Sequence, residues 1–135
     1  MNKIIASLFA SATQLAAAPA LAQVVVVVSP KAAESSMTKE QVAQFFLGKS
    51  SSMTPVDQAD SAPVRAEFYK KVADKDAAQA KALWSKLVFT GKATMPKEVA
   101  DNAAVKAAVA ANPKAIGYIE KSAVDATVKV VYTAP

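Results

Sequence analysis

The residues best suited to chemistry stand together in the stretch "DQADSAPVR" at positions 57 to 65. It ends on Arg65, the only arginine of the chain. Pro63 predicts a helix start, because its ring presets the backbone angle that a helix needs. Such a start turns the backbone N–H groups of Val64 and Arg65, the Arg65 guanidinium and, after a small shift of the loop, the Ser61 hydroxyl toward one point. With the positive end of the helix dipole, these groups predict a binding site for a small anion.

The same stretch also has a purely structural interpretation. Asp60 or Ser61 would cap the helix, and Arg65 would form an ion pair with Asp57 or Asp60. A carboxylate beside the helix start also repels an anion, and Pro63 has no N–H group to offer to one. The sequence leaves both interpretations open.

The composition excludes most catalytic chemistry. The 135 residues include no cysteine and no histidine, which rules out thiol catalysis, histidine base chemistry and the usual zinc sites. A serine with a lysine base remains, but no motif selects such a pair. Asp57 and Asp60 are paired carboxylates by their spacing, but no second acid cluster accompanies them, so they do not indicate catalysis by two acids. We therefore expect a protein that is not an enzyme and holds no metal or cofactor.

The net charge of +5 comes almost entirely from lysines that are spread along the chain. Nucleic-acid surfaces gather arginine and lysine on one face and add stacking aromatic side chains. No such cluster occurs here, so we expect no nucleic-acid partner.

Residues 1–22 are predicted to be a signal peptide. They carry a single charge, at Lys3, followed by an Ala-rich apolar run that closes on Ala20, Leu21 and Ala22, the small-x-small pattern of a signal-peptidase site. Polar residues and a proline interrupt this run, which falls short of the roughly 20 apolar residues that a membrane span needs. We expect residues 23–135 to form one exported domain in the periplasm or cell envelope, without a membrane span after cleavage.

The elements that must position the candidate residues follow from periodicity and capping signals. The run "VVVVV" predicts a central strand of a parallel or mixed sheet, because β-branched side chains without alternation suit a strand buried on both faces. The order of elements predicts an α/β fold, in which helices flank a mixed sheet. Strands are expected at residues 24–28, 54–57, 115–120 and 127–133, and helices after the N-terminal signals Thr38, Pro63, Asp76 and Asp101.

The helix expected after Asp76 contains Trp84, which could stack on a ligand or belong to the core. Its spacing favours the core, because apolar residues recur around it at helical intervals. These residues are Ala80, Leu83, Trp84, Leu87 and Val88.

Three further positions are candidates to lie near a ligand. Ser35 and Ser36 follow the first strand, at the presumed carboxyl edge of the sheet where α/β proteins place ligands, unless they are only polar loop residues. Gly117 lies within an expected strand, where a glycine indicates a close backbone approach or a bulge.

Three segments, in this order, resemble the phosphate-binding proteins of ABC transporters. "SSMTKEQVAQFFLGK", "APVRAEFYKKV" and "NPKAIGYI" resemble the family's Ser-Ser-Leu-Thr-x-x-Gln-Leu-x-x-Ile-Phe-x-Gly-Lys, Gly-Ser-Gly-Thr-Arg-x-x-Phe and Asn-Pro-Gly-Ala-Ile-Gly-Tyr segments. The resemblance implies the fold of one lobe of a type II periplasmic binding protein. It also implies a non-enzymatic module that binds phosphate or another small oxyanion for ABC-type uptake, with a transporter permease or a second lobe in trans as partner.

The candidate site departs from that family's pattern. Ala62, Pro63 and Val64 stand where the family has serine, glycine and threonine, so the hydroxyl groups in register are missing. This departure keeps an alternative function open, in which an envelope interaction or structural protein retains the lobe and has lost the ligand site.

Overall fold

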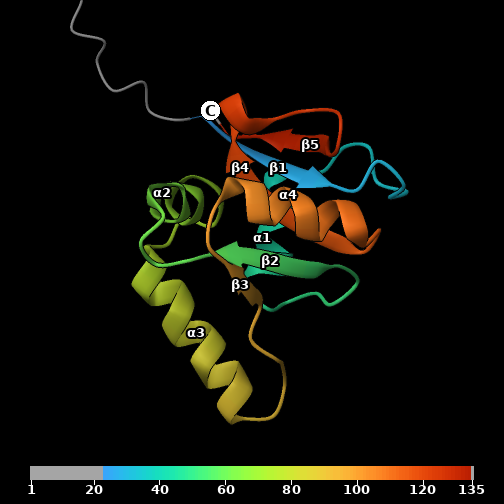
Figure 1. Ribbon diagram of the computed structural model, residues 1–135. Coiled ribbons are helices and arrows are strands. Elements are labelled where there is room, and N and C mark those ends of the chain that lie inside the picture. Colours follow the sequence, from blue (N-terminus) through green and yellow to red (C-terminus); the bar gives the residue numbers. More distant parts are fainter. Residues whose placement is uncertain (1–22, 135) are drawn as a thin grey trace, which may run out of the picture.

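The computed structural model describes residues 23–134 and consists of one sheet with helices on both faces (Figure 1). This is the α/β architecture with a mixed sheet that the sequence predicts. The predicted signal peptide, residues 1–22, lies outside the described residues. Among the residues that are described, no helix combines the length and the apolar character that a membrane crossing requires.

The sheet contains five strands in the order β3-β2-β4-β1-β5. β2 (Thr54–Gln58) runs parallel to both of its neighbours, β3 (Lys97–Val99) and β4 (Ala115–Glu120). β1 (Val24–Val28) runs antiparallel to β4 and to β5 (Lys129–Thr133). All five valines of β1 are buried, so the predicted interior strand is confirmed.

β3 was not predicted from the sequence. It is three residues long, lies at an edge of the sheet and exposes Lys97 and Glu98. Two charged residues after a proline are more typical of a loop than of a strand. The strand forms because the edge of β2 is available, where Val56 pairs with Lys97 and Gln58 with Val99. The neighbouring strand, rather than local propensity, therefore determines this element.

α1 (Lys39–Phe46) lies on one face of the sheet and begins with the predicted capping box between Thr38 and Gln41. Gly48 follows its end with a φ of +73°, a conformation that glycine adopts without strain. A Cβ atom at Gly48 would also collide with a methyl carbon of Leu87. Gly48 therefore ends α1 and leaves room for the helix that contains Leu87 to pack against it.

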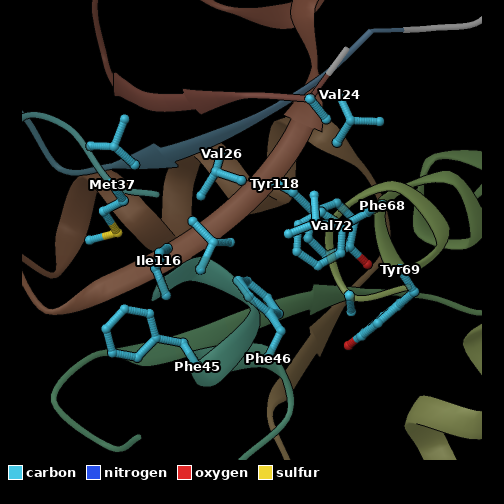
Figure 2. Packing of buried hydrophobic residues seen from close by; sticks show 14 of the residues in the cluster. Val24, Val26, Met37, Phe45, Phe46, Phe68, Tyr69, Val72, Ile116 and Tyr118 are labelled. Carbon is cyan, nitrogen blue, oxygen red and sulfur yellow. The ribbon is translucent and has the colours of Figure 1, made fainter. Parts of the chain in front are cut away.

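α2 (Pro63–Val72) covers the same face and contributes to an aromatic core (Figure 2). The rings of Phe68 and Tyr118 stack with their centroids 4.0 Å apart, and Phe46 meets both rings edge to face. Offset and edge-to-face pairs add to the energy of burial. Because Tyr118 is on β4 and Phe68 on α2, this cluster fixes the helix against the middle of the sheet.

α3 (Ala77–Phe89) packs on α2 and contacts the end of α1, and its far end reaches beyond the sheet (Figure 1). Asp76 and Gln79 form the predicted capping box at its start. Trp84 is 5% exposed and donates its indole N–H to the carbonyl oxygen of Phe46 at 2.7 Å, which confirms its place in the core. The predicted inward position of Val88 is wrong, because its side chain is 39% exposed. The end of α3 extends past the helices on which it packs, so nothing covers this residue fully.

α4 (Asn102–Ala111) covers the opposite face of the sheet, with Val105 and Val109 buried. Gly117 in the middle of β4 allows this approach, because a Cβ atom there would lie 2.5 Å from a methyl carbon of Val105. Gly117 keeps its regular pairing with Val27 and Val56, so the close-approach interpretation is confirmed and the bulge interpretation is wrong.

Candidate oxyanion site

The candidate site lies where the carboxyl ends of β2 and β3 meet the first turn of α2. The chain leaves β2 through a tight turn, in which the Ala62 N–H donates to the Ala59 carbonyl at 2.9 Å. The Ala59 N–H donates to the carbonyl of Val99 at 2.9 Å, which ties the loop to β3. Pro63 opens α2 as predicted, but the capping residue is Ala62. The predicted cap by Asp60 or Ser61 is therefore wrong, since no side chain caps this helix.

Arg65 is the centre of the site and is only 4% exposed. Its Nη1 atom donates to the carbonyl oxygen of Gln58 at 2.7 Å and lies 3.1 Å from a carboxylate oxygen of Asp60 and 3.5 Å from one of Glu98. Its Nη2 atom lies 3.8 Å from a carboxylate oxygen of Asp57. Within the described part of the chain, the Nε atom has no hydrogen-bond partner. The ion-pair interpretation of Arg65 is thus observed, with more acids than the sequence indicated.

Asp57 is the buried acid of the cluster, with 4% of its surface exposed. It accepts a hydrogen bond of 2.5 Å from the Tyr69 hydroxyl, another from the Tyr118 hydroxyl and a third from the Gln58 N–H at 2.9 Å. Burial, followed by the negative charge of Asp57, raises the pKa of both tyrosines far above the ordinary value. Both hydroxyl groups therefore stay protonated and donate to the carboxylate.

The cluster carries a net negative charge. Burial lowers the pKa of the Arg65 guanidinium, but nearby negative charges, with that of Asp57 first, raise it by more. The net shift of the pKa is upward, so the group stays cationic. A hydrogen bond from Lys81, together with the charge of Arg65, lowers the pKa of Asp60. Three carboxylates, of Asp57, Asp60 and Glu98, thus face two cations, Arg65 and Lys81. A free anion must compete with these acids for the guanidinium.

The three predicted anion-binding residues lie together at the start of α2. Ser61 is exposed and Val64 is buried. The Arg65 N–H donates to the Ala62 carbonyl at 3.1 Å, so this N–H is already used, contrary to the expectation that it is free. The Arg65 guanidinium therefore remains as a donor at this helix start, while the Arg65 N–H does not.

The other predicted positions lie elsewhere. Ser35 and Ser36 follow β1, whose carboxyl end pairs with the first residues of β4 because the two strands are antiparallel. These serines consequently stand at the end of the sheet opposite to Arg65, and Ser36 lines a separate surface hollow of about 310 Å³. Gly117 faces α4, whereas Tyr118, next to it, faces α2 and Asp57.

Five members of the cluster were not predicted from the sequence. Tyr69 lies one helical turn after Arg65, which is the single spacing signal that the sequence offered. Gln58 adjoins Asp57 in the chain, whereas only the tertiary structure brings the remaining three residues to the cluster. The five residues are Gln58, Tyr69, Lys81, Glu98 and Tyr118.

Comparison with known proteins gives similarity at the level of structure only. No protein-family model matches the chain, and no curated protein matches it. The solved structures that are similar include three that each match over 81% of this chain: an ABC-type phosphate transport receptor from Vibrio cholerae (TM-score 0.63, 18% identity), a protein from Clostridium perfringens described as a putative phosphate ABC transporter substrate-binding protein with bound phosphate (0.64, 20%), and PstS from Borrelia burgdorferi (0.61, 14%). The match spans 45%, 44% and 46% of these chains, so this chain covers under half of their length. The chain therefore has the α/β fold of part of these proteins, as the resemblance implied.

Proposed function

We propose that this chain, which has the fold of one part of phosphate-binding transport proteins, is a non-enzymatic binding module for phosphate or another small oxyanion. The observation that carries the proposal is the buried guanidinium of Arg65 at the start of α2, which already holds carboxylate oxygens of Asp60 and Glu98. A phosphate presents the same kind of anionic oxygen to a guanidinium as a carboxylate does. The ligand would take the place of these two carboxylates.

Exposure separates the fixed members of the site from the movable ones. The side chains of Arg65 and Asp57 are 5% and 6% exposed, whereas those of Asp60 and Glu98 are 60% and 44% exposed. Asp57 would therefore remain the counter-ion of Arg65, while Asp60 and Glu98 turn into solvent when an anion enters. Because the anion must displace two acids and stay near a third, we expect binding in the millimolar range.

The proposed role is solute binding in connection with ABC-type uptake, outside the cytoplasm, with residues 1–22 as the export signal. The structural similarity to two proteins described as parts of phosphate ABC transport supports this role. The proposal includes an ABC permease as partner and a second lobe in trans as the opposite side of the clamp.

The acids around Arg65 favour a second candidate function, a lobe that has lost its ligand and serves as an envelope interaction or structural protein. Pro63 lacks an N–H group, the Arg65 N–H is already bonded, and carboxylates already occupy the guanidinium. In this case Arg65 only holds α2 against β2 and β3.

Isothermal titration of the protein with phosphate and with sulfate at low ionic strength tests the proposal. Removal of the competing charge in Asp60→Asn and in Glu98→Gln should tighten phosphate binding by about tenfold each, because an ionised hydrogen-bond competitor is lost. Glu40→Gln, an exposed acid on α1, is the matched control and should change nothing. Arg65→Lys should weaken binding by about tenfold or more, because it keeps the charge beside Asp57 but loses the forked geometry.

Lysine is preferred to alanine at position 65, because alanine would leave Asp57 buried without its cation and could unfold the protein. If the wild-type protein and both acid-to-amide variants give no phosphate heat at millimolar concentration, the oxyanion function is wrong and the second candidate stands.

A further inference from the structure

The end of α3 carries exposed apolar side chains that the fold does not use. Phe89, the last residue of the helix, is 93% exposed, and Val88 beside it is 39% exposed. Met95, in the loop that returns to β3, is 41% exposed. In Figure 1 the end of α3 stands apart from every other element. Three of the four large exposed apolar side chains of the described residues belong to this segment.

The inner side of α3 explains why these side chains remain uncovered. Ala80 and Trp84 are buried against the layer below, and Leu87 packs beside Gly48 at the end of α1. The helix continues for two more residues after this last contact. Clustered exposed apolar surface on a small protein commonly marks a docking site, whereas single exposed residues need no explanation. We call Val88 and Phe89 the apolar tip.

The charged residues in the chain segment that contains the apolar tip all have one sign. No acid occurs between Asp76 and Glu98, while four lysines do. Lys81 forms an ion pair with Asp60, but the ion pairs of the described residues include none for the three others. Lys92 lies directly at the tip, since its N–H donates to the Leu87 carbonyl at 2.9 Å. The three lysines are Lys86, Lys92 and Lys97.

We propose that the apolar tip docks on the surface of an anionic lipid membrane. Phe89 and Val88 enter the boundary between headgroups and acyl chains, and Lys86 and Lys92 lie among the lipid phosphates. This proposal does not depend on the oxyanion site, which meets α3 through the ion pair between Lys81 and Asp60, about two helical turns before Phe89.

Charge and shape favour a membrane over the other occupants. A second copy of this chain would bring lysines against lysines, which is unfavourable. A stable protein interface uses about 20–30 residues on each side, far more than this protruding end presents. A bilayer needs no complementary pocket, because lipids rearrange around a small apolar projection.

The test places an environment-sensitive fluorophore on single cysteines in this cysteine-free chain. Ser85→Cys puts the label one helical turn before Phe89 on the same exposed side of α3. Vesicles of equal parts phosphatidylglycerol and phosphatidylcholine should shift its emission to the blue, and vesicles of phosphatidylcholine alone should not. Phe89→Ser should abolish the shift, and Lys86→Gln and Lys92→Gln should each weaken vesicle binding roughly fivefold.

The matched control label is Ser122→Cys, which should not respond. Position 122 follows Lys121, whose N–H donates to the Gln23 carbonyl, so this label also reports docking through the segment around Gln23. The control charge variant is Lys121→Gln, which should bind like the wild type. Far-ultraviolet circular dichroism verifies that Phe89→Ser stays folded. The proposal is overturned if the emission shift is absent at position 85 or appears only at position 122. It is also overturned if the shift persists in Phe89→Ser or occurs equally with neutral vesicles.

Discussion

The Asp57 and Arg65 pair shows how a strand places a buried charge. Neighbouring side chains of β2 face opposite sides of the sheet, so Val56 lies in the cluster under α4 and Asp57 faces α2. A buried carboxylate is costly unless it is paired and hydrogen-bonded. Two tyrosine hydroxyls, one backbone N–H and the Arg65 guanidinium supply these partners.

The two tyrosines at Asp57 predict a loss of stability in alkaline solution. Their folded-state pKa values are raised, so the folded protein keeps both protons, while the unfolded chain releases them above about pH 10. The contribution is fully present below the unfolded pKa and is lost as the pH rises above it, by about 1.4 kcal/mol per pH unit for each tyrosine. Urea unfolding at a series of alkaline pH values measures this slope.

Tyr118→Phe should make that slope shallower, although it lowers stability at neutral pH by about 1–3 kcal/mol because Asp57 loses a donor. Tyr132→Phe, whose hydroxyl is not a donor to Asp57, is the matched control. An equal slope in wild type and in Tyr118→Phe would contradict the raised pKa of Tyr118 in the folded protein.

At the scale of elements, local sequence signals determine some helices and strands, and tertiary contacts determine others. α1 and α3 each begin with a capping box within their own sequence. α2 has no side-chain cap, and its first turn is held by Arg65 against β2 and β3 instead. β3 likewise depends on its pairing with β2. At the candidate site, α2 and β3 therefore depend on tertiary contacts more than α1 and α3 do.

Gly117→Ala should destabilise the protein by about 1–3 kcal/mol, because the added methyl group meets Val105 of α4 in a packed layer. The free energy of unfolding from chemical denaturation measures the loss. The double variant with Val105→Ala supplies the control, since the smaller side chain makes room for the new methyl group. The two losses should then sum to more than the loss of the double variant, and strict additivity would show that α4 does not rest on Gly117.

For the whole molecule, the sheet unites two cores. Val24, Val26 and Val28 of β1 belong to the core under α1 and α2, and the valines between them belong to the core under α4. The indole of Trp84 joins α3 to α1 through its hydrogen bond to Phe46. A change in either core is therefore transmitted through the same strand.

This arrangement predicts a single cooperative unfolding transition. Trp84 is the only tryptophan, so its fluorescence reports on the α3 side, while far-ultraviolet circular dichroism reports on the whole chain. The two denaturation curves should coincide, and Val109→Ala on α4 should shift both equally, by about 1–3 kcal/mol. A fluorescence change that precedes the circular dichroism change would show instead that α3 unfolds as a separate unit.

Much of the fold was predictable from the sequence alone. Five adjacent valines, the capping boxes at Thr38 and Asp76 and the glycines at positions 48 and 91 determine where elements begin and end. These signals act between residues close in sequence, which is why they can be identified without a structure. The α/β class and the boundaries of α1 and α3 follow from them, as does Trp84 in the core.

Only the tertiary structure decided strand direction and the surroundings of Arg65. β1 is antiparallel to β4, which carries Ser35 and Ser36 to the end of the sheet away from Arg65. Glu98 reaches Arg65 through a strand that exists only by pairing, and Tyr118 reaches Asp57 from a position 61 residues away. Such contacts depend on which elements pack together, and no local pattern encodes them. The sequence thus determined the secondary structure and the class of fold, whereas long-range packing decided whether the one arginine faces an open site or a ring of acids.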